Sequence, residues 1–174
     1  MVSILLLVVI YMSFISLGLP DSMLGAAWPM IYPTIGADVS MAGFISMTAC
    51  IGTVISSLSF SKIARRFSTR VITAFSIFVT SFALFLMSKA TSIYMMLPIS
   101  LLLGLGGGCV DSALNNYVSL HYSTGAMSFL HGFWGVGTTI GPILLGILIP
   151  LGYTWRTGYV SLSAIQGMIL FLSI

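Results

Sequence analysis

The sequence predicts an all-α membrane protein whose six transmembrane helices form two inverted three-helix repeats. Of its 174 residues, 58% are hydrophobic and only 5% are charged, whereas a soluble domain carries about 25% charged residues. Its apolar stretches reach the length of about twenty residues that a membrane-spanning helix needs. The ten-residue alternation that is typical of membrane β-barrel strands is absent. We therefore expect lipid, rather than water, to surround most of the chain.

Six apolar segments are separated by short breaks that hold most of the charged and turn-forming residues. The first segment lacks a basic leader region and its apolar run continues through Trp28, so it predicts a membrane helix rather than a signal peptide. Glycine or proline residues crowd around Asp21 and before Asp111, so we expect the first and fourth helices to be broken there. The expected spans cover residues 3–32, 41–60, 71–88, 94–120, 127–150 and 158–174.

An internal repeat relates the two parts of the chain. Residues 18–24 (GLPDSML) match residues 108–114 (GCVDSAL), and residues 44–53 match residues 129–138 at one constant offset. The repeat unit is therefore three helices, and its copies cover residues 1–88 and 89–174. An odd number of spans separates the copies, so they have opposite orientations in the bilayer. Inverted repeats with irregular helices near the midplane are typical of secondary transporters.

The basic residues indicate how the chain is oriented in a plasma (inner) membrane. The second loop holds four of them, whereas the loops on the opposite face hold only Lys89 and Arg156. Because cytoplasmic loops carry an excess of Lys and Arg, we expect the second loop and both chain ends to be cytoplasmic. The four residues are Lys62, Arg65, Arg66 and Arg70. No basic footprint of a nucleic-acid-binding protein is present, so no nucleic-acid partner is expected.

Two of the three acidic residues, Asp21 and Asp111, occupy equivalent places in the repeat. A carboxylate at mid-membrane depth costs roughly 2.5–3.5 kcal/mol on insertion scales, so such residues are functional candidates. Each could bind a proton or another cation and accept hydrogen bonds from a polar solute. The alternative is a hydrogen-bonded acid that only stabilises a helix break.

Further polar and aromatic residues share helix faces with these acids. Asn115 lies one turn after Asp111, and Asn116 belongs to the neighbouring polar stripe. We expect them to line a cavity or, alternatively, to form interhelical hydrogen bonds.

On the fifth helix, His131 and Trp134 share one face, and Trp28 lies two turns after Asp21 on the first helix. His131 could relay protons, and the indoles could form flat walls for a sugar ring. Aromatic side chains also anchor helices at membrane interfaces, and that alternative stays open for all three.

Neither a metal centre nor a cofactor is expected from the residue spacing. The two cysteines, Cys50 and Cys109, fall inside apolar stretches, which predicts buried, reduced thiols. The Gly-x-Gly-Asp and Gly-x-Ser-Gly motifs of intramembrane proteases are absent, so an enzyme is not expected. A channel is not expected either, because there is no filter motif or ring of like charges.

The loop between the second and third helices resembles the signature of the major facilitator superfamily, Gly-x-x-x-Asp-Arg-x-Gly-Arg-Arg/Lys. Residues 57–66 (SLSFSKIARR) keep the basic positions and lack the Asp and both Gly. The resemblance implies that residues 1–174 are the N-terminal six-helix half of a twelve-helix fold. A second six-helix half would then follow in a longer chain or come from another subunit.

Residues 108–115 (GCVDSALN) are similar to the fourth helix of the fucose–proton symporter family. That family usually has Glu at the position of Asp111 and an Asp in its first helix, which Asp21 matches. The resemblance implies that Asp21 couples protons and that Asp111 recognises a sugar.

The motif Gly137-x-x-x-Gly141-Pro142 also resembles the fifth helix of drug–proton antiporters. We therefore expect a secondary active transporter that moves a small polar solute, such as a sugar, by alternating access and is coupled to protons or another cation. The alternative is a proton-coupled antiporter that exports drugs or other amphipathic compounds.

Overall fold

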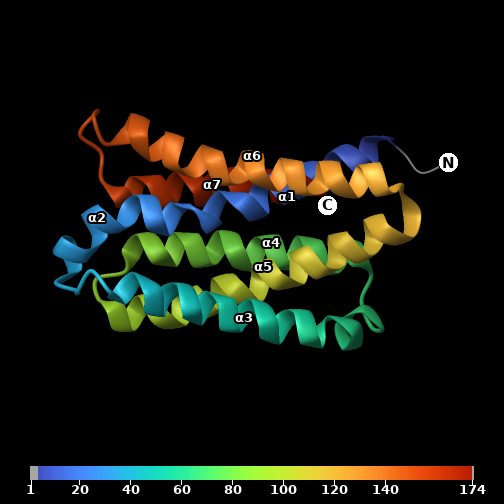
Figure 1. Ribbon diagram of the computed structural model, residues 1–174, viewed down its shortest axis with the longest axis horizontal. Coiled ribbons are helices and arrows are strands. Elements are labelled where there is room, and N and C mark those ends of the chain that lie inside the picture. The colour runs from blue at the N-terminus through green and yellow to red at the C-terminus, as the bar shows by residue number, and fades with distance from the viewer. Residues whose placement is uncertain (1–3, 174) are drawn as a thin grey trace.

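The computed structural model describes residues 4–173, and this part of the chain folds into an elongated bundle of helices (Figure 1). Within these residues, five runs are long and apolar enough to cross a membrane, and α7 packs beside them as a sixth helix of the bundle. The predicted all-α class and the six spans are confirmed. Positions 3 and 174, at the outer ends of the first and last predicted spans, lie outside the described residues. The helices are α1 (Ile4–Asp21), α2 (Met23–Ile35), α3 (Met41–Ala64), α4 (Thr69–Lys89), α5 (Ile93–His121), α6 (Thr124–Leu148) and α7 (Trp155–Ser173).

The first span is broken as expected, and α1 and α2 are its two pieces. Pro20 lies in the last turn of α1, where it has no N–H to donate to the helix ladder. Asp21 is the last residue of α1, and Ser22 precedes the first residue of α2. The break therefore coincides with the first intramembrane carboxylate.

The expected break in the fourth span is wrong, because α5 runs without interruption from Ile93 to His121. The glycines before Asp111 serve a different purpose. A side chain on Gly104 would collide with the carbonyl of Ala49, and one on Gly108 would collide with Ser56 of α3. These positions need glycine so that two helix backbones can approach, and the helix stays intact.

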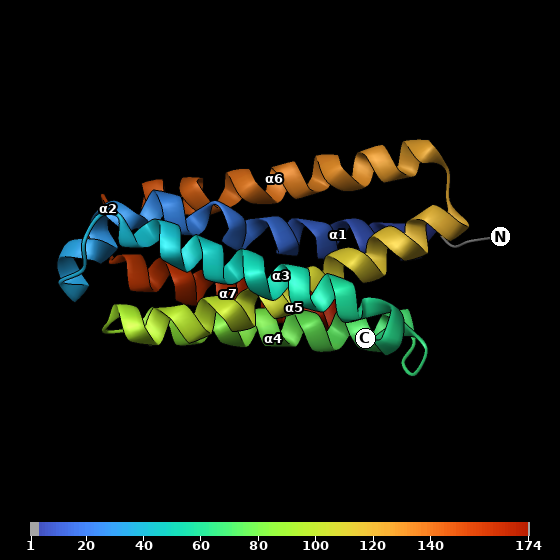
Figure 2. The same ribbon diagram turned by 60° about the horizontal axis from the view of Figure 1, so that its bottom comes forward.

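The packing of the helices follows the inverted repeat. The most extensive contacts join α3 to α5, α1 to α6, α4 to α5 and α4 to α7, and the two views of the bundle agree with this arrangement (Figures 1 and 2). The repeat pairs the first span with α5, α3 with α6 and α4 with α7. It therefore exchanges the α3–α5 contact with the α1–α6 contact and maps the α4–α7 contact onto itself. The two three-helix copies are interlocked rather than separate.

Matching glycines stand at the two exchanged contacts. A side chain on Gly52 of α3 would meet the carbonyl of Leu101 in α5, and one on Gly137 of α6 would meet the carbonyl of Ile15 in α1. Gly52 and Gly137 are equivalent in the repeat. Both copies thus use the same small residue to bring a peripheral helix onto a central one.

Hydrogen bonds join α4 to α7, both in the middle of the two helices and near one end. Ser81 of α4 and Ser163 of α7 each donate to the other's backbone carbonyl, at 2.9 and 2.8 Å. Arg156 donates to the carbonyl of Ser88 at 2.7 Å. These contacts hold α7 against α4 on the side of the bundle away from α3.

The turn before α3 is organised by Asp38, whose carboxylate accepts hydrogen bonds from the backbone and hydroxyl of Ser40 at 2.8 and 2.6 Å. These donors keep the pKa of the exposed Asp38 carboxyl below its ordinary value, so the turn is intact at neutral pH. The basic loop between α3 and α4 lies at the other end of the bundle, the end at which the N-terminus is marked (Figure 1).

Candidate functional site

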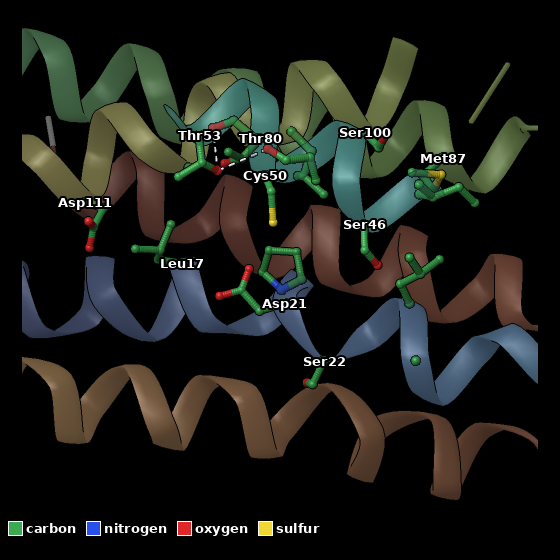
Figure 3. A pocket seen from close by; sticks show the side chains of 18 of the residues that line it. Leu17, Asp21, Ser22, Ser46, Cys50, Thr53, Thr80, Met87, Ser100 and Asp111 are labelled. Carbon is green, nitrogen blue, oxygen red and sulfur yellow. Dashed lines mark hydrogen bonds between the residues drawn. The ribbon is translucent and has the colours of Figure 1, made fainter. Parts of the chain in front are cut away.

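A cavity of about 690 Å³ lies near the middle of the bundle, and both intramembrane aspartates line it (Figure 3). Its walls come from the break between α1 and α2, from α3 and α5, and from Trp134 of α6. Deeper lining residues come from α4 and α7. The lining combines apolar side chains with hydroxyl, amide and carboxylate groups, and no lysine or arginine is among its described members. Polar groups of the lining are Asp21, Ser22, Ser46, Thr53, Thr80, Ser100, Asp111, Trp134, Tyr159 and Gln166.

Asp21 enters the cavity because the helix ends at this residue. Its carboxylate accepts a hydrogen bond from the indole Nε1 of Trp134 at 2.8 Å, which joins α1 to α6. The neighbouring Ser22 hydroxyl donates to the Thr138 carbonyl of α6. Figure 3 shows the Asp21 carboxylate directed into the cavity and Ser22 directed toward α6. Two successive residues at the break therefore bind the same turns of α6.

Asp111 lies on the continuous helix α5 and is half-buried. Asn115, one turn later, donates from Nδ2 to the Asp111 carboxylate and to the Asp111 carbonyl, both at 2.9 Å. Asp111 is within electrostatic range of Asp21 and also of the ring of His131. Two like charges that share a cavity repel each other, so a proton or another cation bound at either carboxylate would relieve this repulsion.

The other predicted site residues lie outside the cavity lining. Asn116 is exposed on α5. His131 is exposed on α6, with its ring edge toward Phe14 at a centroid distance of 6.0 Å. Trp28 is only 6% exposed, and its indole donates to the Val39 carbonyl at 2.8 Å. The structure thus brings Asp21, Asp111 and Trp134 together in one cavity, adds Asn115 through Asp111, and leaves Trp28, Asn116 and His131 outside the lining. His131 is nevertheless within electrostatic range of Asp111.

Gln166 of α7 lines the cavity and is absent from the residues predicted from the sequence. It is completely buried, and its Nε2 donates to the Ser16 carbonyl at 2.6 Å. Its Oε1 atom has no hydrogen-bond partner among the residues that the structure describes. A buried amide oxygen without a partner is costly, and it can accept a hydrogen bond from a hydroxyl. The signal in the sequence is that Gln166 is the only glutamine and stands within an apolar segment.

Cys50 of α3 also lines the cavity and its side chain is exposed, so the expectation of a buried thiol is wrong there. Apolar neighbours in the sequence do not distinguish a helix face that packs from one that borders a cavity. Cys109 is half-buried. Among the described residues, no group of three or more His, Cys, Asp or Glu side chains could hold a metal ion.

The arrangement can bind a proton or another cation together with a polar solute. The two carboxylates and the Gln166 oxygen are hydrogen-bond acceptors, while the hydroxyls of the lining can donate or accept. The apolar remainder of the lining and the indole of Trp134 provide surface for carbon skeletons.

Comparison with known families identifies the fold to which this bundle belongs. A search of curated proteins gave no match. The model of one family, described as the Major Facilitator Superfamily, matches residues 10–174, which is nearly the whole chain. Proteins of this family are transporters rather than enzymes, in agreement with a cavity built for binding. The chain therefore belongs to the Major Facilitator Superfamily and is an integral membrane transport protein.

Proposed function

We propose that this chain is the N-terminal six-helix half of a secondary active transporter that moves a small polar solute, such as a sugar, with protons. The observation that carries the proposal is the pair of carboxylates, Asp21 and Asp111, which come from repeat-related helices and line one cavity without a lysine or arginine. A carboxylate with only a structural role would be paired with a basic side chain that neutralises it. A carboxylate that couples transport to an ion must instead bind and release a proton or another cation.

The two carboxylates differ in their surroundings, and this difference supports separate roles. Asp21 stands at a helix break and joins α1 to α6 through Trp134, so its protonation would change a contact between helices. Asp111 stands on an unbroken helix beside the amide of Asn115, which is a suitable setting for binding solute hydroxyls. We assign coupling to Asp21 and solute recognition to Asp111. The resemblance of residues 108–115 to the fucose–proton symporter family supports a sugar as the solute.

A second six-helix half would complete the transporter, supplied by the same longer chain or by another subunit. Among the candidate spans of the described residues, α3 and the equivalent helix α6 have the smallest buried share. Both border the cavity side of the bundle, and exposed side chains there include Met47, Ile51 and Trp134. A partner half packed over these helices would enclose the cavity, and rocking of the halves would give alternating access.

We place the protein in the plasma (inner) membrane with both ends of this segment in the cytoplasm. The basic loop between α3 and α4 lies at the same end of the bundle as the first turns of α1 (Figure 1). An excess of Lys and Arg on that side supports the orientation.

The test of coupling uses the full-length protein in proteoliposomes with an imposed pH gradient and a labelled hexose. Asp21→Asn is expected to abolish gradient-driven accumulation while exchange of hexose across the membrane persists, because the solute site remains. Asp111→Asn is expected to weaken hexose binding itself. The matched control is Asp38→Asn, which neutralises the third aspartate outside the cavity. Accumulation that survives Asp21→Asn at the wild-type level would contradict the assignment.

Export of amphipathic compounds in exchange for protons is the second candidate. It is favoured by the Gly137, Gly141 and Pro142 spacing on α6, where Gly137 and Gly141 both face the backbone of α1. Leu17, Leu24 and Leu103 among the cavity-lining residues also suit an apolar compound. Proton-driven efflux of a lipophilic cationic dye, with no hexose uptake, would favour this function over sugar symport.

A further inference from the structure

A second cavity of about 690 Å³ opens between α3 and α4, away from the aspartates. These helices are consecutive in the chain and yet make few contacts with each other, because α5 packs against both and separates them. The result is a groove with α3 and α4 as walls and α5 as floor. Its lining is almost wholly apolar and includes Ile55, Ile63, Phe67, Val71, Phe75 and Leu105.

Basic residues are next in the chain to residues that line one end of this groove. Three of them immediately precede a lining residue in the chain, as Lys62 precedes Ile63, Arg66 precedes Phe67 and Arg70 precedes Val71. The side chains of Lys62, Arg65, Arg66 and Arg70 are all exposed. The acidic residues lie elsewhere: Asp21 and Asp111 line the central cavity, and Asp38 lies in the loop at the opposite end of the bundle. The mouth of the groove is therefore strongly positive.

The length of the groove corresponds to one leaflet of a bilayer. Its lining on α3 extends from Ile55 to Ile63, which is about 12 Å along a helix axis at 1.5 Å per residue. One leaflet of the hydrocarbon core is about 15 Å thick. The groove thus begins at the basic loop, where headgroups lie, and ends near the depth at which an acyl chain of that leaflet ends.

We propose that this groove is a binding site for an anionic phospholipid of the leaflet that borders the α3–α4 loop. One acyl chain lies between α3 and α4, and the phosphate and anionic headgroup contact Lys62, Arg66 and Arg70. Clusters of basic residues next to membrane helices attract anionic headgroups, and the groove adds a fitted surface for the chain. The site is independent of the solute site, so its test does not depend on which solute is carried.

The experiment uses the full-length protein in nanodiscs that contain phosphatidylglycerol and phosphatidylcholine with identical acyl chains. The protein is transferred to mild detergent, and the retained lipid of each class is counted by native mass spectrometry. Phosphatidylglycerol is expected to be retained preferentially. Arg66→Gln is expected to weaken its retention roughly fivefold, since each basic residue near a membrane surface contributes about 1 kcal/mol. Lys89→Gln, at the other end of α4, is the matched control and is expected to have no effect.

A second pair of variants tests the groove separately from the charges. Ser59 lines the groove, so Ser59→Phe is expected to fill it and to reduce phosphatidylglycerol retention with all basic residues in place. Leu58 is 77% exposed and outside the groove, so Leu58→Phe is expected to leave retention unchanged. The proposal would be overturned if the two lipid classes were retained equally or if neither were retained. Loss on Arg66→Gln without loss on Ser59→Phe would also overturn it, because the lipid would then be held by surface charge alone.

Discussion

Replacing Gly137 by alanine tests the contact that positions α6 and, with it, Trp134. The added Cβ would collide with the Ile15 carbonyl and lie 3.0 Å from the Gly18 Cα, so the three nearest atoms all belong to the backbone of α1. Backbone atoms cannot rotate away as the end of a side chain can. The two helices must therefore separate, and the Trp134–Asp21 hydrogen bond, one turn from Gly137, is lengthened.

The expected loss of stability is obtained by comparing Gly137→Ala with Gly135→Ala, because Gly135 is a glycine of the same helix that has open space around it. Among the described residues, no atom beyond the neighbouring backbone of α6 lies within 4 Å of a Cβ built on Gly135. Both alanines gain up to about 1 kcal/mol of helix propensity, so this gain cancels between the variants. Overpacking costs typically about 1–3 kcal/mol, and Gly137→Ala should be less stable than Gly135→Ala by that amount. At 2–4 °C per kcal/mol, the difference in Tm is roughly 2–12 °C.

The assay is thermal unfolding of the purified protein in mild detergent, followed by tryptophan fluorescence. The inverted repeat supplies a second, independent pair on α3. Gly52→Ala would meet backbone atoms of α5, whereas Gly43→Ala would meet no described atom within 4 Å beyond the neighbouring backbone of α3. We expect the same order of stability in this pair. If Gly137→Ala and Gly52→Ala unfold at the same temperature as their controls, close backbone packing does not position these helices and the reasoning fails.

Three further predictions concern the cavity. Cys50 is exposed in the cavity wall, so a thiol reagent should label it and bound solute should slow the labelling. Labelling of Cys50→Ser measures the background, and an unchanged labelling rate at saturating solute would place the solute elsewhere. Trp134→Phe removes the donor to Asp21 and should lower the free energy of unfolding by about 1 kcal/mol, which is less than the roughly 1.5–3 kcal/mol of a hydrogen bond to a charged group because the pair is exposed. A denaturant titration measures this change, and Trp134→Tyr is the comparison that keeps a polar tip. Gln166→Leu removes the donor to the Ser16 carbonyl and an acceptor that has no partner among the described residues, so the free energy of unfolding should change by less than about 1 kcal/mol. Hexose affinity, measured by equilibrium dialysis, should fall several-fold, and unchanged affinity would exclude Gln166 from the solute site.

Much of the fold can be read from residues alone. Apolar runs of membrane length require helices, because in lipid each backbone N–H and C=O must be satisfied within the segment. The match between residues 18–24 and 108–114 then relates the helices in pairs. The break at Asp21 was also predicted, since glycine and proline crowd around this residue and Pro20 removes a backbone donor from the last turn of α1.

The continuity of α5 was not predictable from its glycines. Gly104 and Gly108 lack side chains because α3 approaches them closely, and this reason is visible only when α3 is in place. The same limit applies to the aromatic residues. Trp28 follows Asp21 in the first span and Trp134 stands on α6, yet the Trp28 indole donates to the Val39 carbonyl and the Trp134 indole donates to Asp21.

Composition and local pattern by themselves determined that this chain is a helical membrane protein and that its two three-helix repeats are inverted copies. They also identified Asp21 and Asp111 as the acidic residues inside apolar segments. These properties depend on transfer between water and lipid and on backbone hydrogen bonding, which act on each segment separately. Only the tertiary structure decided that Gln166 reaches the cavity, that Trp28 does not, and that a groove separates α3 from α4. Those outcomes depend on which faces meet when helices distant in the chain pack together, and van der Waals contact between them is set by the shapes of both partners at once.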